Sequence, residues 1–294
     1  MKVKKKILIL GSSGNLGFEL YNKLKKDFIV SHNGLIKKKL DITNVKNLEK
    51  IIKKNNPNII INAAGYVNLD LCEKNKKKCL KINADIIKNI FLVRKKIDQH
   101  FKILHFSTDQ LYDGKPFYKT EKHKIKINNF YSKTKHLSEK IALRHNSTVF
   151  RINFFGFKKN KSGSLDMFIK NSIRNGNCIL FDDVYFNPLR IKTIVNIIHK
   201  IIKKNKLSSG LFNLGSKDGL SKKDFYILIF KYLKKNINYK SFKVNSYLNT
   251  KRSRNMLMSV KKFEEKYNIR LPLIKNEIKK EIIENYENIK NRKK

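Results

Sequence analysis

The 294-residue sequence has few cysteines and no long apolar run. Its three cysteines, Cys72, Cys79 and Cys178, are odd in number and form no CxxC pair, which argues against a disulfide framework and a zinc site. The seven histidines show no HxxxH or HxH pattern, so no metal site is predicted. No stretch approaches the ~20 apolar residues of a membrane helix, and the run Ile7–Leu10 is too short for a signal peptide. We therefore expect free thiols and a cytoplasmic protein without membrane insertion.

Acidic residues are scarce, with 23 Asp and Glu against 67 Lys and Arg, which gives a net charge of +44. Such an excess suggests polyanionic partners such as nucleic acid, an anionic membrane surface or nucleotide substrates. However, the excess is mostly lysine spread along the whole chain, and Asn and Ile are also abundant. AT-rich codons specify these three residue types. Arginine, which makes bidentate contacts to phosphates and bases, is not enriched. We therefore expect codon bias to be the main cause, and no specific nucleic-acid binding.

The chain is long enough for one large α/β domain or for a domain with a smaller lobe. Short apolar strands alternate with amphipathic helices up to Gly156, which predicts a doubly wound parallel sheet of the Rossmann type over residues 1–156. The pattern then loosens, and residues 157–294 are predicted to form mostly a smaller C-terminal lobe, with elements near 191–216 returning to the first domain. Strands are expected within KILIL, DFIVSHN, NPNIIINAAG, FKILHFSTD, STVFRINFFG and GLFNLGS. Helices are expected within FELYNKLKKD, VKNLEKIIKK, residues 79–96, YSKTKHLSEKIALRH, residues 165–175, residues 191–204 and SKKDFYILIFKYLKK. Thr43 or Asn44 is expected to cap the second helix, and Ser221 the last.

The stretch GSSGNLG follows the first predicted strand and opens the first predicted helix. Glycines in that place allow a tight turn and let the backbone approach a pyrophosphate at the positive end of the helix. The spacing is GxxGxxG, which differs from the GxGxxG fingerprint typical of dinucleotide-binding folds. The predicted cofactor loop consists of Gly11, Ser13, Gly14, Asn15, Leu16 and Gly17.

The end of the second predicted strand indicates which dinucleotide is used. Ser31, His32 and Asn33 stand there, with Lys37–Lys39 just beyond. None is a carboxylate that would hold the ribose 2′-hydroxyl and repel a 2′-phosphate, so NADP(H) is favoured and NAD(H) stays open. Asp41, with its neighbour Ile42, lies later in LDIT, and we assign it to the adenine side of the cofactor.

Tyr131 and Lys135 lie four residues apart in YSKTK and would share one face of a helix. A free tyrosine has a pKa of about 10, and a nearby ammonium favours the phenolate. The pair could then protonate a carbonyl oxygen while a hydride reaches its carbon. From this spacing alone a solvated helix face is the better interpretation. Thr108 changes that balance, because it adds a hydroxyl at the carboxyl end of a central strand, where ligands bind in parallel sheets. Together these features favour a nucleotide-dependent carbonyl reductase or dehydrogenase.

Several stretches resemble the extended short-chain dehydrogenase/reductases and, more narrowly, the dTDP-4-dehydrorhamnose reductase family. They span nearly the whole chain: GSSGNLG, LDIT, INAAGYVNLDLCE, KINAD, FSTDQLYDGKPFYKTE, YSKTKHLSE, FRINFFG, NPLR and RSRNMLMSVKKFE. The chain departs from the family at Gln110–Tyr112, where Tyr-Val-Tyr/Phe is usual, and at Arg252-Ser253, where Arg-Pro is usual. Both departures concern the substrate side, so the sugar stays open.

The resemblance implies NADPH-dependent reduction of the 4-keto group of a deoxysugar nucleotide, of the dTDP-4-dehydro-L-rhamnose to dTDP-L-rhamnose type, for surface polysaccharide synthesis. The C-terminal lobe would bind the nucleotide sugar. Tyr131 would donate the proton, and Lys135 would also hold the nicotinamide ribose. Two alternatives remain, namely a reductase or epimerase of another nucleotide sugar, and a non-catalytic regulatory subunit. Family members can form homodimers and use Mg²⁺, but no acidic cluster supports a metal here. The implied positions are Thr108, Tyr131 and Lys135 for catalysis, Asn62, Ala63, Ala64 and Tyr66 for the cofactor groove, Asn83 for ordering the site, and Asp109, Asn153, Pro188, Arg252 and Asn255 for the substrate.

Overall fold

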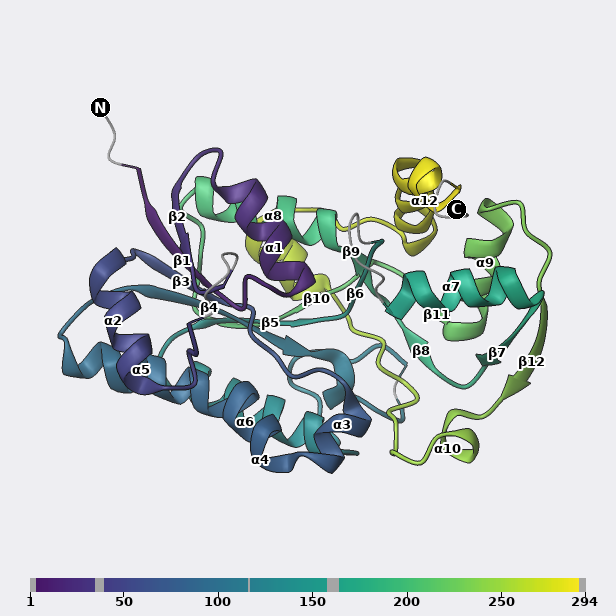
Figure 1. Ribbon diagram of the computed structural model, residues 1–294, viewed down its shortest axis with the longest axis horizontal. Coiled ribbons are helices and arrows are strands. Elements are labelled where there is room, and N and C mark those ends of the chain that lie inside the picture. Colours follow the sequence, from purple (N-terminus) through teal and green to yellow (C-terminus); the bar gives the residue numbers. More distant parts are fainter. Residues whose placement is uncertain (1–3, 35–39, 116, 158–163, 291–294) are drawn as a thin grey trace. The chain divides into compact units, whose positions relative to one another are not determined.

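The computed structural model describes residues 4–34, 40–115, 117–157 and 164–290 (Figure 1). The chain forms two compact units and passes between them several times. Unit 1 consists of Met1–Thr108, Ile127–Arg151 and Thr193–Phe212, and unit 2 consists of Asp109–Lys126, Ile152–Lys192 and Asn213–Lys294. The predicted boundary at residue 156 stays a prediction.

Unit 1 is built on a six-stranded sheet in the order β10-β5-β4-β3-β1-β2. The central pairs run parallel, so that Leu8 of β1 lies beside Ser31 of β2 on one side and Ile60 of β3 on the other. All four residues of β3 are buried, as expected for a strand covered on both faces. The strands are β1 (Lys6–Leu10), β2 (Ile29–His32), β3 (Ile59–Asn62), β4 (Lys102–Thr108), β5 (Thr148–Ile152) and β10 (Gly210–Leu214). The predicted parallel α/β architecture is confirmed.

Helices cover both faces of this sheet. In Figure 1, α2, α5 and α6 lie on one face, and α1 and α8 lie on the other. The helices are α1 (Asn15–Leu24), α2 (Val45–Asn55), α3 (Leu69–Lys74), α4 (Lys76–Leu80), α5 (Ile86–Lys96), α6 (Phe130–Arg144) and α8 (Ile191–Lys203), with a π-helical turn at Lys81–Asp85 between α4 and α5. Asn44 caps α2, because its side chain accepts hydrogen bonds from the backbone N–H groups of Lys46 and Asn47. The predicted helices of this part are confirmed, and α3 was not predicted.

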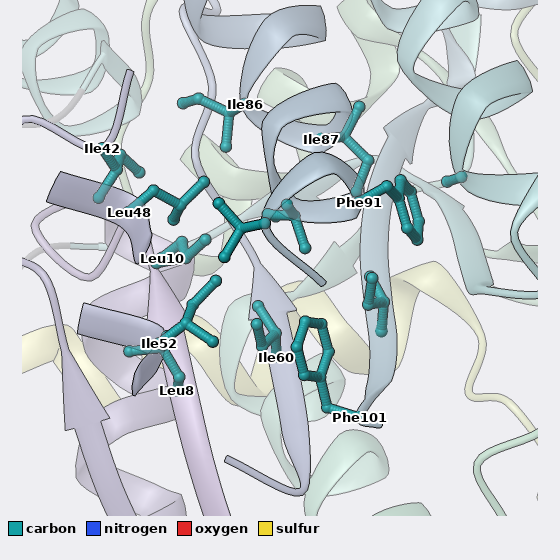
Figure 2. Packing of buried hydrophobic residues seen from close by; sticks show 14 of the residues in the cluster. Leu8, Leu10, Ile42, Leu48, Ile52, Ile60, Ile86, Ile87, Phe91 and Phe101 are labelled. Carbon is teal, nitrogen blue, oxygen red and sulfur yellow. The ribbon is translucent and has the colours of Figure 1, made fainter. Parts of the chain in front are cut away.

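The core of unit 1 lies between the sheet and the α2–α5 layer, where apolar side chains from both meet (Figure 2). Full burial of each such side chain contributes about 1.5–3 kcal/mol relative to leaving it exposed, and this packing fixes where each strand ends. The labelled members of the cluster are Leu8, Leu10, Ile42, Leu48, Ile52, Ile60, Ile86, Ile87, Phe91 and Phe101.

The strand order reverses at β1, because β2 lies on one side of it and β3 on the other. In open parallel sheets, ligands bind outside the carboxyl ends of the strands at such a reversal. The residues that follow β1 and β3, beginning with Gly11 and Ala63, and the last residue of β4, Thr108, therefore share the edge where a ligand is expected.

The described residues of unit 2 form a core of their own and three small two-stranded sheets. The pairs are β6 with β9, β7 with β12, and β8 with β11. Its strands are β6 (Phe154–Phe155), β7 (Asn177–Phe181), β8 (Tyr185–Phe186), β9 (Leu189–Arg190), β11 (Leu220–Ser221) and β12 (Asn238–Phe242), and its helices are α7 (Ser164–Asn175), α9 (Lys222–Tyr232), α10 (Val244–Tyr247), α11 (Lys261–Tyr267) and α12 (Ile274–Lys290), with a 3-10 turn at Asp109–Leu111.

A helix cap and a group of ion pairs position two helices of unit 2. The Ser221 hydroxyl caps α9 by accepting a hydrogen bond from the Asp224 N–H, as predicted. Arg190 of β9 binds α12 through Glu281 at 2.8 Å and Glu284 at 2.6 Å. The helices α11 and α12 and the strand β12 were not predicted from the sequence. None of the helices in the described ranges is long and apolar enough to cross a membrane.

Candidate active site

The glycine loop after β1 packs closely against the loop after β3. Gly11 has φ +82°, and a Cβ atom there would lie 2.4 Å from the Ala64 backbone nitrogen, so both conformation and space require glycine. A Cβ atom at Gly17 would lie 2.3 Å from the Gly11 carbonyl oxygen. The Gly14 carbonyl accepts from the Phe18 N–H at 2.9 Å, which begins α1 at the loop. The loop therefore presents backbone and a helix N-terminus, as a bound pyrophosphate needs.

Asn33 braces this loop from the end of β2. Its Oδ1 accepts a hydrogen bond from the Gly11 N–H at 2.9 Å. The position where a ribose-binding carboxylate would stand thus holds an amide that is engaged with the backbone. No sequence signal distinguished this contact, because the partners lie 22 residues apart. Lys37–Lys39 lie outside the described residues. Asp41 is exposed and accepts from the N–H and hydroxyl of Thr43, and Ile42 is buried in the core.

The loop after β3 is held by two buried asparagines. Asn62 accepts from the Ala64 N–H at 3.2 Å. Asn83, in the π-helical turn, accepts from the Tyr66 N–H at 2.7 Å and donates to the Tyr66 carbonyl at 3.1 Å. The same amide donates to the Thr134 hydroxyl of α6 at 3.1 Å. The implied ordering role of Asn83 therefore has a structural basis, because one side chain satisfies both backbone groups of Tyr66 and connects them to α6.

The two cysteines near this loop have packing roles. Cys72 and Cys79 are free thiols and are fully buried. The Cys72 thiol donates to the Tyr66 carbonyl at 3.2 Å, and Cys79 Sγ lies 3.4 Å from the Thr134 hydroxyl. Burial, followed by the hydrogen bond with Cys79, raises the pKa of the Cys72 thiol, which disfavours the reactive thiolate. The prediction of free thiols is confirmed.

The start of α6 is fixed, and with it Tyr131. Asn129 and Ser132 form a capping box, in which each side chain accepts from the backbone N–H of the other. Tyr131 follows in the first turn with 8% of its surface exposed, and Lys135 lies one turn later with 4% exposed. The Lys135 ammonium donates to the Phe106 carbonyl of β4 at 2.5 Å, two residues before the buried Thr108. A solvated helix face is therefore the wrong interpretation of this pair.

A buried polar chain connects Lys135 to the β3 loop. Asn62 Nδ2 lies 3.2 Å from Nδ1 of His105, and Nε2 of His105 lies 3.0 Å from the Ser138 hydroxyl, which donates to the Lys135 carbonyl at 2.8 Å. Because Asn62 Nδ2 can only donate, we assign the proton of the ring to Nε2. Burial, followed by the charge of Lys135, holds the pKa of His105 well below its usual range, so this histidine is neutral.

A second buried network surrounds Glu139, one turn after Lys135. Its carboxylate accepts from the Ser107 hydroxyl at 2.8 Å and pairs with both Nε and Nη2 of Arg151, at 2.9 and 2.5 Å. Burial lowers the pKa of Lys135 to about 8, and the Glu139 charge opposes that shift. Lys135 is therefore mostly charged at neutral pH. Arg151, at the end of a predicted strand, could be expected either to brace the site or to be structural, whereas Glu139 was not predicted at all, although it supports Ser107 and Lys135 together.

The residues implied for substrate binding gather in unit 2. Asp109 is 2% exposed and accepts from the side chain of Asn153 at 2.5 Å. The residue after Pro188 donates its N–H to the Asn153 carbonyl at 3.1 Å, so Pro188 lies next to this pair. Asn255 donates to the Gly114 carbonyl at 2.8 Å.

The segment 252–256 lies against the segment that follows Asp109. Ser253 donates to the Gln110 carbonyl at 3.1 Å, and the Arg254 N–H donates to Asp113 at 2.9 Å. Lys119, which is 1% exposed, donates to the carbonyls of Gly114 and Asn255 at 2.7 and 3.2 Å. Burial lowers the pKa of Lys119 to about 8. The sequence did not single out Lys119, because lysine is abundant everywhere. Within the described ranges, no group of three or more His, Cys, Asp or Glu side chains is placed to hold a metal ion.

Comparisons with known proteins agree with this architecture. The dTDP-4-dehydrorhamnose reductase of Aggregatibacter actinomycetemcomitans is 28% identical over 76% of this chain and 78% of that protein, and the Escherichia coli enzyme of the same name is 22% identical over 90% and 93%. The Bacillus anthracis dTDP-4-dehydrorhamnose reductase structure, a complex with NADP, matches with a TM-score of 0.86 at 21% identity, over 96% of this chain and 100% of that one. A hypothetical dTDP-4-dehydrorhamnose reductase from Sulfolobus tokodaii matches with a TM-score of 0.77 at 26% identity, over 88% and 94%. Residues 5–287 match the family described as RmlD substrate binding domain. This chain belongs to the RmlD substrate-binding domain family, and the family resemblance drawn from its motifs is confirmed.

Proposed function

We propose that this protein reduces the 4-keto group of a deoxysugar nucleotide with hydride from NADPH, in the manner of dTDP-4-dehydro-L-rhamnose reduction for polysaccharide synthesis. The observation that carries the proposal is the buried Tyr131–Lys135 pair, packed against the end of β4 in a dinucleotide-binding fold. Relatives named dTDP-4-dehydrorhamnose reductase support the substrate class. A similar structure described as a complex with NADP supports the cofactor.

The residues present fit the dinucleotide. Glycine at position 11 lets the loop lie directly against the Ala64 backbone, where a Cβ atom would clash, and no carboxylate stands at Ser31–Asn33 to repel a 2′-phosphate. Gly14, Ala64 and Tyr66 would line its binding groove. When bound, NADPH supplies a hydride to the keto carbon. If NADH were oxidised faster than NADPH in parallel assays with the substrate, NAD(H) would be the preferred cofactor.

The protein's own residues would supply the proton. The Tyr131 hydroxyl gives its proton to the keto oxygen as the carbon accepts the hydride, so the C=O group becomes CH–OH. The Lys135 ammonium stabilises the resulting phenolate, which then takes a proton from solvent. The Thr108 hydroxyl donates a hydrogen bond to the same oxygen and so orients the carbonyl group for proton transfer from Tyr131. Burial strengthens each of these interactions, because the local dielectric is low.

The test follows the loss of reduced-nicotinamide absorbance. Purified protein is mixed with enzymatically made dTDP-4-keto-6-deoxysugar after 3,5-epimerisation, with NADPH and NADH in parallel. We expect rapid oxidation that prefers NADPH. Tyr131→Phe should lose about 10²–10⁴-fold in kcat and still bind NADPH, whereas Tyr239→Phe, an exposed control on β12, should be unaffected.

Two outcomes would redirect the proposal. Full turnover in Tyr131→Phe would overturn the assigned proton donor. NADPH binding without oxidation of any 4-keto sugar nucleotide would favour another nucleotide sugar or a regulatory subunit. We also extend the proposal to a cytoplasmic homodimer, which analytical ultracentrifugation and cell fractionation would test.

A further inference from the structure

Two buried hydroxyls of α6 bind the backbone carbonyls of the proposed catalytic pair. The Thr134 hydroxyl donates to the Tyr131 carbonyl at 2.8 Å, and the Ser138 hydroxyl donates to the Lys135 carbonyl at 2.8 Å. Each hydroxyl lies three residues after the carbonyl that it binds, and neither side chain is more than 1% exposed. Helical serine and threonine commonly bind a carbonyl of the preceding turn, so the donors that these hydroxyls accept from decide whether they have a further role.

Beyond Ser138, a chain of hydrogen bonds leads to the loop after β3. His105, which is fully buried, donates from Nε2 to the Ser138 hydroxyl at 3.0 Å and accepts at Nδ1 from the Asn62 amide at 3.2 Å. The Oδ1 atom of the same amide accepts from the Ala64 N–H at 3.2 Å. The Ala64 contact fixes which end of the Asn62 amide faces the ring. The chain therefore runs in one direction, from Asn62 to the Lys135 carbonyl.

A second chain begins at the same loop and ends at Tyr131. Asn83 accepts from the Tyr66 N–H at 2.7 Å and donates to the Thr134 hydroxyl at 3.1 Å. Thr134 then donates to the Tyr131 carbonyl. All of these residues belong to unit 1. The loop after β3 is therefore joined by side-chain hydrogen bonds to the backbone of both members of the proposed catalytic pair.

The two chains can hold the pair in place but cannot supply it with protons. Each chain ends on a backbone carbonyl, which accepts a hydrogen bond and has no proton to pass on. A buried polar network whose members all have partners makes its surroundings rigid. The ammonium of Lys135 is fixed in addition by the carbonyl of Phe106, the neighbour of His105 in β4. The loop and the start of α6 are therefore expected to keep one relative position.

We propose that His105, Ser138 and Thr134 are positioning residues that couple the loop after β3 to Tyr131 and Lys135. The coupling would hold the bound dinucleotide and the proton donor in one geometry. This inference rests on the proposed function and adds residues that touch neither substrate nor cofactor. A displacement of about 1 Å at a reacting group can cost about 10²-fold in rate, so the loss of one buried hydroxyl should be measurable in turnover.

The variants remove one hydrogen-bonding group at a time. Thr134→Val removes a hydroxyl at nearly constant volume, and Thr134→Ser keeps it. Ser138→Ala and His105→Leu each interrupt the other chain. The matched control is Ser172→Ala in α7 of unit 2, because the buried Ser172 hydroxyl makes the same kind of bond, to the Phe168 carbonyl at 2.8 Å.

Steady-state kinetics and urea unfolding separate positioning from a merely structural role. Thr134→Val and Ser138→Ala should each lower kcat about 10- to 100-fold and leave KM for the sugar nucleotide within about twofold. Thr134→Ser should keep kcat within about threefold of wild type, since the hydroxyl remains. Ser172→Ala should lose as much stability in urea as Ser138→Ala and keep the wild-type kcat.

NADPH binding, followed by the fluorescence of the reduced nicotinamide, tests the coupling without turnover. His105→Leu, Ser138→Ala and Thr134→Val should each raise Kd for NADPH about 3- to 10-fold, because the loop and Lys135 both contact the dinucleotide in the proposed function. Combining His105→Leu with Ser138→Ala should raise Kd no further than one of them does, since both interrupt one chain. Combining His105→Leu with Thr134→Val should multiply the two effects, since they interrupt different chains.

Three results would overturn the coupling. They are an unchanged kcat and Kd for NADPH in all three single variants, equal effects in Ser172→Ala, and effects that multiply in both combinations. If wild type bound NADPH but reduced no 4-keto sugar nucleotide, the proposed reductase would fail. The NADPH affinities of the variants would then still confirm or refute the coupling, so the two proposals fail separately.

Discussion

Lys135 should make the nucleotide-free protein less stable below pH 8 than a protein without that charge. Burial takes its pKa from 10.5 to about 8, which corresponds to about 3 kcal/mol of unfavourable free energy for the charged form. Lys135→Met removes this cost and also loses the hydrogen bond to the Phe106 carbonyl, worth about 1 kcal/mol. At pH 7 the variant should therefore be more stable by about 2 kcal/mol, although it loses turnover.

The sign of the pH dependence follows from the protons bound. Between pH 8 and 10.5 the unfolded chain keeps the proton of Lys135 while the folded protein releases it, so wild-type stability rises with pH. The advantage of Lys135→Met should shrink through this window and vanish near its upper end. Urea unfolding of both proteins at pH 7, 8, 9 and 10 measures the difference. Lys119 also has a lowered pKa, but it contributes equally to both proteins and cancels. A difference that stays constant with pH would refute the reasoning.

Two further predictions concern the residues around this site. Gly11→Ala should abolish NADPH binding and lower the free energy of unfolding by more than about 2 kcal/mol, because it combines a positive φ with a backbone clash. Gly114→Ala, with φ +70° and no atom within 4 Å of the added Cβ, should lower it by only about 1 kcal/mol and leave NADPH binding intact. Equal losses of stability in urea unfolding would contradict this. Glu139→Gln leaves Arg151 buried without its carboxylate and should cost about 3–5 kcal/mol, while Glu139→Leu/Arg151→Met should recover most of that loss. If the double variant were as unstable as the single one, the ion pair would not be the cause.

The sequence predicted what depends on local pattern. The buried strands of unit 1 appear as short apolar runs, and the caps at Asn44 and Ser221 appear as polar residues before helical periodicity. The catalytic candidates were found because three weak signals follow one another along the chain: the glycine loop, the hydroxyl of Thr108 at the end of a strand, and the spacing of Tyr131 and Lys135. Their burial could not be predicted, because Tyr131 and Lys135 are covered by packing of α6 against β4, which the helix sequence does not specify.

The supporting residues depend on contacts between distant parts of the chain. Asn83 acts on a residue 17 positions away and on Thr134, 51 positions away, and no local pattern records such distances. Glu139 resembles a surface residue of an amphipathic helix until Ser107 and Arg151 are placed around it. The short helix α3 has only six residues, too few to show helical periodicity.

The basic side chains fall into two groups, a few that are buried with partners and many that are exposed to solvent. The fully buried basic side chains include Lys119, Lys135, Arg151 and Arg190. Each has fixed partners, either backbone carbonyls or carboxylates. Exposed lysines need no partner, because water and salt screen them, so codon bias suffices to explain the bulk of the +44 charge.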